Sequence, residues 1–231
     1  FANYLAFKLA NYGKEVLVLS KNKDINKKYN SSLKILSMSD YLFFDHLDLN
    51  KTLNLKKINL QKYFSKKKIM IFHNAAVKSK DLEKSFNVNY FSHLKILEYI
   101  SKSFPDIHKT HIFVSSLGKY TESIFYPYYN STKAALSSTI SSYKFFNNKN
   151  QNFLLIEPSM IESKMIKKTS LTKYFLISQK KASNQIFKFF SLNYYKNKKY
   201  ILGKKFFFVI FLLKVLPTNL KMKILQNNSH K

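Results

Sequence analysis

Short apolar segments alternate along the chain with longer segments whose apolar residues recur every three or four positions. The short segments have the length of strands and end in polar or turn-forming residues. They are residues 15–19, 41–44, 68–72, 111–114 and 152–156. The helical segments are residues 2–12, 82–103 and 128–146. This alternation predicts an α/β fold in which helices cover both faces of a parallel sheet.

Polar or small residues follow each of the five predicted strands directly. These segments are residues 20–22, 45–48, 73–76, 115–116 and 157–159. In an open parallel sheet the ligand crevice lies at the carboxyl ends of the strands. The sequence therefore predicts that these five segments line one crevice at one edge of the sheet.

The chain has 231 residues, which predicts one domain spanning residues 1–231. Its net charge is +28, and all 40 basic residues are lysine because the sequence contains no arginine. A protein that reads nucleic acid is expected to use the planar arginine side chain for two-pronged contacts with bases and phosphates. We therefore attribute the charge to the composition of an A+T-rich genome and expect no specific nucleic-acid partner.

The content of cysteine and histidine limits the chemistry further. The chain has no cysteine, so it can form no disulfide, thiolate metal site or cysteine nucleophile, and a reducing, cytoplasmic compartment is expected. Its six histidines lack the spacing of metal ligands. No metal centre is expected.

One tyrosine and one lysine carry the candidate chemistry. Tyr129 and Lys133 lie four positions apart in a predicted helix, which places them on one face of it. The pattern Tyr-x-x-x-Lys occurs six times, but only Tyr129 has a serine just after a strand, thirteen positions earlier. That serine is Ser116, and the three residues form the candidate centre.

Further motifs surround this centre in a fixed order. They are His73-Asn-Ala-Ala76, Phe86-Asn-Val-Asn89, Val114-Ser-Ser116, Tyr129-Asn-Ser-Thr-Lys133 and Pro158-Ser-Met-Ile-Glu-Ser163. With them the chain resembles the short-chain dehydrogenase/reductase family over residues 1–167. The resemblance implies a Rossmann-like, doubly wound parallel sheet. It also implies an NAD(P)-dependent oxidoreductase that acts on a small-molecule carbonyl or alcohol.

The resemblance assigns catalytic roles to four residues. Tyr129 exchanges a proton with the substrate, Ser116 donates a hydrogen bond to the substrate oxygen, and Lys133 contacts the nicotinamide ribose. Asn89 holds a water that links Lys133 to solvent. A phenol with a pKa near ~10 needs tuning, and an ammonium about 4 Å away at a dielectric of about 20 is worth roughly three pKa units. Lys133 is therefore expected to bring the pKa of Tyr129 close to neutral.

NADP is favoured over NAD as the cofactor. An NAD enzyme usually places a carboxylate after the second strand, whereas Lys21 there suits a 2′-phosphate. The resemblance gives Asp48 the adenine amino group, with Asp45 as the less favoured choice. The residues expected to line the cofactor are Ser20, Lys21, Asp48, Asn74, Ala75, Ala76, Tyr129, Lys133, Pro158, Ser159 and Ile161.

The first residues match the family from within its phosphate-binding motif. The pattern Ala6-x-x-Leu9-Ala10-x-x-Gly13 corresponds to the helix after the Gly-rich turn. The fold is thus expected to lack the family's first strand and Gly-rich loop. We expect a fragment of a longer gene product, and the alternative is a non-catalytic scaffold or an inactive fragment.

Residues 166–231 are expected to supply the substrate region. Residues 166–193 are rich in Phe, Leu, Ile and Lys, which favours an apolar pocket. The tail at 198–217 resembles that of membrane-peripheral family members and favours a lipophilic or acyl substrate, with an apolar core element as an equal alternative. The apolar run at 206–213 is shorter than the ~20 residues of a spanning helix, and a core element is favoured for it over membrane contact. Peripheral membrane contact through the C-terminal tail and a homo-oligomer paired through the helices of Asn89 and Tyr129 are further expectations.

Overall fold

The structure is a computed structural model of the chain. It describes residues 5–6, 8–9, 16–20, 42–46, 49, 60, 68–121, 126–145, 150–163, 166, 174–193, 195–220 and 223. The helix predicted over residues 2–12 is therefore described only at residues 5–6 and 8–9, which are helical.

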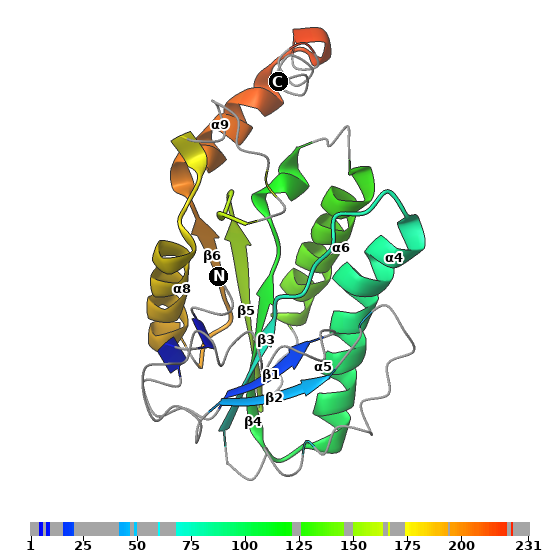
Figure 1. The fold of residues 1–231 in the computed structure, drawn as a ribbon, viewed down its shortest axis with the longest axis vertical. Coiled ribbons are helices and arrows are strands. Elements are labelled where there is room, and N and C mark those ends of the chain that lie inside the picture. The colour runs from blue at the N-terminus through cyan, green and yellow to red at the C-terminus, as the bar shows by residue number, and fades with distance from the viewer. Residues whose placement is uncertain are drawn as a thin grey trace.

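A parallel sheet with the strand order β3, β4, β5, β6 forms the centre of the described chain (Figure 1). Its strands are β3 (Lys68–His73), β4 (His108–Val114), β5 (Gln151–Pro158) and β6 (Lys198–Leu202). Each neighbouring pair is parallel, so all four carboxyl ends lie at the same edge of the sheet. The predicted strands at 68–72, 111–114 and 152–156 are confirmed, whereas the sequence reading missed β6.

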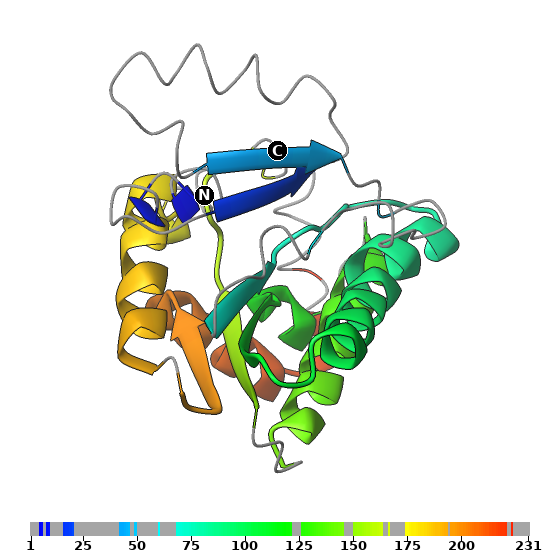
Figure 2. The same cartoon turned by 90° about the horizontal axis from the view of Figure 1, so that it is seen from below.

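Two further strands form a sheet of their own. β1 (Val16–Ser20) and β2 (Leu42–His46) pair in parallel, with Val16 opposite Leu42. The described pairings join neither strand to the four-stranded sheet, and Figure 2 shows the pair apart from it. The strands predicted at 15–19 and 41–44 are confirmed.

Helices cover both faces of the four-stranded sheet. One face carries a helical stretch formed by α4 (Leu82–Phe86), the π-helical turn η2 (Asn87–Phe91) and α5 (Ser92–Ser103), with α6 (Pro127–Tyr143) beside it. The other face carries α8 (Gln179–Asn193), as Figure 1 shows. The α/β, Rossmann-like architecture predicted from the sequence is confirmed.

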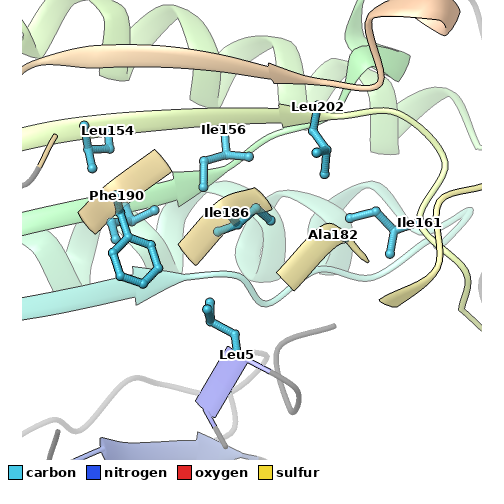
Figure 3. Packing of buried hydrophobic residues seen from close by; sticks show 9 residues of the cluster. Leu5, Leu154, Ile156, Ile161, Ala182, Ile186, Phe190 and Leu202 are labelled. Carbon is cyan, nitrogen blue, oxygen red and sulfur yellow. The ribbon is translucent and has the colours of Figure 1, made fainter. Parts of the chain in front are cut away.

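The core on the α8 side follows from a helical repeat. Ala182, Ile186 and Phe190 recur every four residues along α8 and point toward the sheet (Figure 3). They pack against Leu154 and Ile156, alternate residues of β5. Full burial of one large apolar side chain stabilises a fold by about 1.5–3 kcal/mol, so this row holds α8 firmly to the sheet.

The intervening residues of β5 point to the opposite face. Phe153 and Leu155 pack with Leu136 and Ile140 of α6 and with Leu97 of α5. Because both faces of the sheet are buried, β5 reads as a continuous apolar run rather than as an alternating one. This packing fixes α6, the helix that carries Tyr129 and Lys133, against the strand ends.

The apolar run at 206–213 lies in a helix, α9 (Lys204–Val215), which begins after Gly203 with φ of 90°. Among its described side chains only Ile210 is buried, whereas Phe208 and Phe211 are 61% and 59% exposed. The expectation that this run belongs to the core is therefore wrong for most of its residues. Packing decides burial here, because α9 extends away from the sheet (Figure 1).

None of the helices in the described part of the chain combines the length and apolarity needed to cross a membrane.

Candidate active site

Ser116 lies immediately beyond β4, where the chain turns into the short helix η3 (Leu117–Tyr120). It is the N-cap of that helix, and its Oγ accepts a hydrogen bond of 3.0 Å from the amide of Gly118. A Cβ on Gly118 would lie only 3.2 Å from this Oγ and 2.9 Å from Oδ1 of Asn130. Glycine therefore lets η3 approach α6 closely, which holds Ser116 at the carboxyl edge of the sheet.

Tyr129 stands in the first turn of α6, whose start is set by Pro127 at the first helical position. Burial raises the pKa of Tyr129, and the nearby side chain of Ser116 only partly opposes that shift. The phenol is therefore protonated at neutral pH.

Lys133 is one turn further along α6 and only 1% exposed. Its Nζ donates a hydrogen bond of 2.8 Å to the carbonyl oxygen of Val114 and lies 6.0 Å from the centroid of the Tyr129 ring. Burial lowers the pKa of Lys133 to about 8. The structure thus brings together the hydroxyl, phenol and amine that the sequence predicted to converge.

The expected effect of Lys133 on Tyr129 is wrong for this arrangement. The charge of Lys133 was expected to bring the pKa of Tyr129 close to neutral, yet the pKa of Tyr129 is raised. The physical reason is that both groups are buried, so the loss of hydration outweighs the attraction that an ammonium exerts on a phenolate.

Asn89 lies in the π-helical turn η2 and is fully buried. Its Nδ2 donates to the carbonyl of Val77 at 2.9 Å and to the hydroxyl of Thr132 at 3.1 Å. Its Oδ1 accepts from the amide of Val77 at 2.7 Å. The side chain of Asn89 therefore ties the loop after β3 to α6, the helix of Lys133.

Two further residues lie beside the centre: Ser115, which the sequence placed at the crevice without a role of its own, and Lys78, which it did not single out. Ser115 donates from Oγ to the carbonyl of Lys133 at 2.9 Å and accepts from the hydroxyl of Ser137 at 2.7 Å, which fixes α6 against the end of β4. The Nζ of Lys78 lies 5.5 Å from the centroid of the Tyr129 ring. With 40 lysines in the chain, no sequence signal distinguished Lys78.

The other predicted cofactor residues fall into three groups. Asn74, Ala75 and Ala76 form the loop after β3, where Ala75 is exposed and its carbonyl oxygen lies 2.9 Å from Nε2 of His93. The sites of Lys21 and Asp48 lie outside the described residues, and Ser20 is described only as the last residue of β1.

The third group follows β5. Pro158 ends that strand, the amide of Ser159 donates to the carbonyl of Leu202 at 2.8 Å, and Ile161 forms an isolated bridge with Ile177. These contacts place the segment at the same edge of the sheet as Ser116.

A search of curated proteins found no match. The sequence profile described as short chain dehydrogenase matches residues 1–173. The chain belongs to this family.

The family assignment supports an NAD(P)-dependent oxidoreductase acting on a small molecule. Solved structures of similar fold include a serine dehydrogenase from Escherichia coli, with 12% identity, a TM-score of 0.65, and coverage of 87% of this chain and 91% of that one. An alcohol dehydrogenase from Thermococcus sibiricus, complexed with 5-hydroxy-NADP, has 16% identity, a TM-score of 0.70 and coverages of 87% and 90%. ElxO with NADP bound has 16% identity, a TM-score of 0.71 and coverages of 87% and 91%.

The family implies a nicotinamide cofactor at the carboxyl edge of the sheet, where one buried side chain, packed close to Gly203, lacks a partner within the described part of the chain. Ser159 carries a buried Oγ that has no hydrogen-bond partner among the described residues, and it follows the end of β5 directly. A buried hydroxyl without a partner is costly, so a ligand that bonds to it would be stabilising. The described residues hold no cluster of potential metal ligands.

Proposed function

We propose that the chain is an NADP-dependent reductase of a carbonyl substrate. The observation that carries this proposal is the convergence of Ser116, Tyr129 and Lys133 at the strand ends of a short-chain dehydrogenase. A bound reduced nicotinamide supplies the hydride for such a reduction. The protein must then hold the carbonyl, deliver one proton to its oxygen and exclude water.

Tyr129 donates that proton. Because burial raises the pKa of its phenol, the group is protonated at neutral pH and serves as an acid. Ser116 donates a second hydrogen bond to the substrate oxygen, and this bond strengthens as negative charge develops there. A donor aimed at developing charge lowers the barrier more than it tightens ground-state binding.

Lys133 acts on the phenol after proton transfer. The ammonium of Lys133 stabilises the phenolate of Tyr129, because the charge of an opposite ion is weakly screened in a buried site. With a pKa of about 8, Lys133 is charged at neutral pH and loses its charge in mild alkali. Asn89 fixes the relative position of the β3 loop and α6. We also propose that it holds a water that links Lys133 to solvent.

The cofactor preference rests on Lys21, with Asp48 holding the adenine. Lys21 suits a 2′-phosphate, and two structures of similar fold are described with NADP or a modified NADP bound. Asn74, Ala75 and Ala76 would lie along the adenine ribose, and Pro158, Ser159 and Ile161 would face the carboxamide.

Titration of the full chain with NADPH and NADH, followed by cofactor fluorescence, tests this preference. NADPH is expected to bind at least about tenfold more tightly, and Lys21→Asp should remove that preference while Lys23→Asp retains it. Equal affinity for both cofactors would contradict the assignment of NADP.

The substrate is proposed to be lipophilic, such as a 3-oxoacyl thioester. Residues 166–231 would form the substrate region within one domain of residues 1–231. In this region the ring centroids of Phe175 and Phe206 lie 5.3 Å apart. A panel of aldehydes, ketones and 3-oxoacyl thioesters of increasing chain length, assayed with NADPH, tests this. The ratio kcat/KM is expected to rise with chain length, and a preference for short polar carbonyls would contradict it.

A non-catalytic scaffold is the alternative function. It would retain the fold but bind no nicotinamide cofactor, so the titration above separates it from the reductase. The proposed homo-oligomer, paired through α5 and α6, is tested by sedimentation of the full chain, and a monomer at micromolar concentration would contradict it.

The C-terminal tail is proposed to contact a membrane surface. Phe208, Phe211 and Val215 of α9 are exposed, and Lys204, Lys205 and Lys214 stand at the two ends of the same helix. Exposed apolar side chains flanked by lysines favour the interface of an anionic bilayer.

Vesicle flotation tests the membrane contact. The full chain is expected to float with vesicles of phosphatidylcholine and phosphatidylglycerol, and Phe208→Ser with Phe211→Ser should reduce the bound fraction several-fold. Equal flotation of the two proteins would mean that the net charge alone binds the vesicles and would contradict a role of α9.

A further inference from the structure

A second polar site surrounds Glu157 near the end of β5. Its carboxylate is fully buried and pairs with the Nζ of Lys119 through Oε1. Oε2 accepts a hydrogen bond of 3.1 Å from the phenol of Tyr120 and lies 3.3 Å from the Nζ of Lys199. The carboxylate is thus fully engaged by groups of η3 and β6.

Positive charge exceeds negative charge at this site. Besides Lys119 and Lys199, Lys214 places its Nζ 5.1 Å from the centroid of the Tyr120 ring. Lys144, the C-cap of α6, interacts electrostatically with Lys199, Glu157 and Lys119. We refer to Lys119, Lys144, Lys199 and Lys214 as the lysine cluster. The lysine cluster thus has four ammonium groups for the one carboxylate of Glu157, which contacts Lys119 and Lys199.

The uncompensated charge affects Lys144 most. Burial, together with the charges of the neighbouring Lys199 and Lys119, lowers the pKa of Lys144 to about 8, and Glu157 opposes this only in part. A lysine in such surroundings gains stability when an anion approaches, because the anion offsets both the repulsion and the lost hydration.

An open surface pocket of about 240 Å³ adjoins the lysine cluster at Lys119. Its lining residues are Lys119, Tyr120, Ala134, Ser137, Ser138 and Ser141. The four α6 residues occupy successive turns on one side of the helix, so Ser138 and Ser141 border the same space as Lys119, while the hydroxyl of Ser137 is engaged by Ser115. We refer to this space as the α6 cavity.

The α6 cavity is separate from the candidate active site. Neither Tyr129 nor Lys133 lines it, although both residues and the lining residues of the cavity lie on α6 or next to it. Ser137 marks the wall between the two sites, since its hydroxyl donates to Ser115, which in turn bonds to the carbonyl of Lys133.

We propose that the α6 cavity binds a small oxyanion of the phosphate class. Lys119 supplies positive charge, Ser138 and Ser141 supply hydroxyl donors, and the rest of the lysine cluster supplies the surrounding field. Positive charge remains in excess after the carboxylate of Glu157 is counted. A phosphate, which carries more negative charge than a carboxylate, therefore fits better. A metal cation does not fit, since the oxygens of Glu157 are occupied by lysine and tyrosine donors.

Calorimetric titration of the full chain with inorganic phosphate, at constant ionic strength set with chloride, tests the proposal. Saturable binding above the chloride background is expected. Ser138→Asp, which introduces a negative charge on an exposed lining residue, should weaken binding at least about tenfold.

The matched control is Ser142→Asp, which adds the same charge on the same helix at an exposed position that does not line the cavity. It should change phosphate affinity by less than about twofold. Equal weakening by the two variants would show diffuse attraction to a chain of charge +28 and would overturn the proposal, as would the lack of saturable binding.

Two further readouts complete the test. Phosphate should raise the pKa of Lys144 above about 8 in an NMR titration of its side chain, and an unchanged value would contradict the site. Glycerol phosphate distinguishes the source of the anion: tighter binding than inorganic phosphate indicates the phosphoryl end of a metabolite, and weaker binding indicates the free ion. Neither readout depends on reductase activity.

Discussion

Lys133 and Lys199, one in each site, differ both in burial and in the presence of a carboxylate: Lys133 is 1% exposed, whereas the side chain of Lys199 is 40% exposed and pairs with Glu157. Lys199 lies 3.3 Å from Oε2 of Glu157, and the carboxylate together with Tyr120 raises its pKa despite partial burial. Lys133 has only the carbonyl of Val114 as a described hydrogen-bond partner, and burial lowers its pKa to about 8. Full burial without a counter-ion therefore brings the pKa of Lys133 close to neutral, whereas partial exposure together with Tyr120 and Glu157 keeps the pKa of Lys199 high.

Replacement of the active-site phenol should have the largest effect that separates the two sites. Tyr129→Phe removes the proton donor and is expected to lower kcat by about 10²–10⁴-fold with NADPH and a carbonyl substrate. The fold should survive, because the aromatic ring remains. The control is Tyr128→Phe, the neighbouring residue of α6, which should retain activity; similar losses in both variants would point to damage to α6 instead.

Removal of the carboxylate at the second site should act on stability. Glu157→Gln leaves Lys119, whose side chain is 10% exposed, and the more exposed Lys199 without a counter-ion, and it is expected to lower the free energy of unfolding by up to about 3–5 kcal/mol. Urea unfolding measures this change. A loss below about 1 kcal/mol would mean that water already screens the pair.

The pH dependence of stability should reveal the active-site lysine, Lys133, rather than the pair formed by Glu157. The pKa of Lys133 is about 8 when folded and ordinarily near 10.5, so the unfolded chain binds more protons between these values. The free energy of unfolding therefore rises with pH over this window, and Lys133 contributes about 2 kcal/mol between pH ~7 and pH ~9.5.

Lys133→Met tests that contribution. The variant should lose its share of the rise while the share of Lys144, whose pKa is also lowered to about 8, remains. An unchanged slope in Lys133→Met would contradict the account of Lys133 as a lysine without a counter-ion.

An exposed ion pair should have the smallest effect. Lys102 and Glu98 pair at 2.7 Å on the surface of α5, where water screens both charges. Lys102→Ala is expected to leave urea unfolding unchanged within the error of the measurement. A clear loss would show that a carboxylate stabilises a lysine here regardless of burial.

The sequence predicted the parts of the fold in which the hydrophobic pattern is strong. β3, β4 and β5 each contain a run of apolar residues followed by polar ones, and the apolar α6 residues recur at helical spacing, so each element was found within a few residues. β6 and α8 were missed, because the lysines at Lys198 and Lys199 and the polar residues of α8 obscure their periodicity.

In the candidate site, the sequence predicted which residues lie together but not all of their hydrogen-bond partners. Ser116, Tyr129 and Lys133 are separated by fixed spacings on two neighbouring elements, so their proximity follows from local geometry. The partners of Asn89 could not be predicted, because they depend on the π-helical turn η2 and on the path of the loop at Val77. The buried partners of Glu157 come from η3 and β6, which no sequence pattern brings together.

The most direct test of the proposed carbonyl reduction measures the transfer of deuterium from the cofactor to the substrate. The full chain is incubated with NADPH deuterated at the transferred position and with a long-chain ketone or 3-oxoacyl thioester, and the product is analysed by mass spectrometry. We expect deuterium on the former carbonyl carbon with the unaltered chain and at least about a hundredfold less with Tyr129→Phe. Failure to label any carbonyl substrate, or equal labelling by Tyr129→Phe, would contradict a reductase in which Tyr129 is the proton donor.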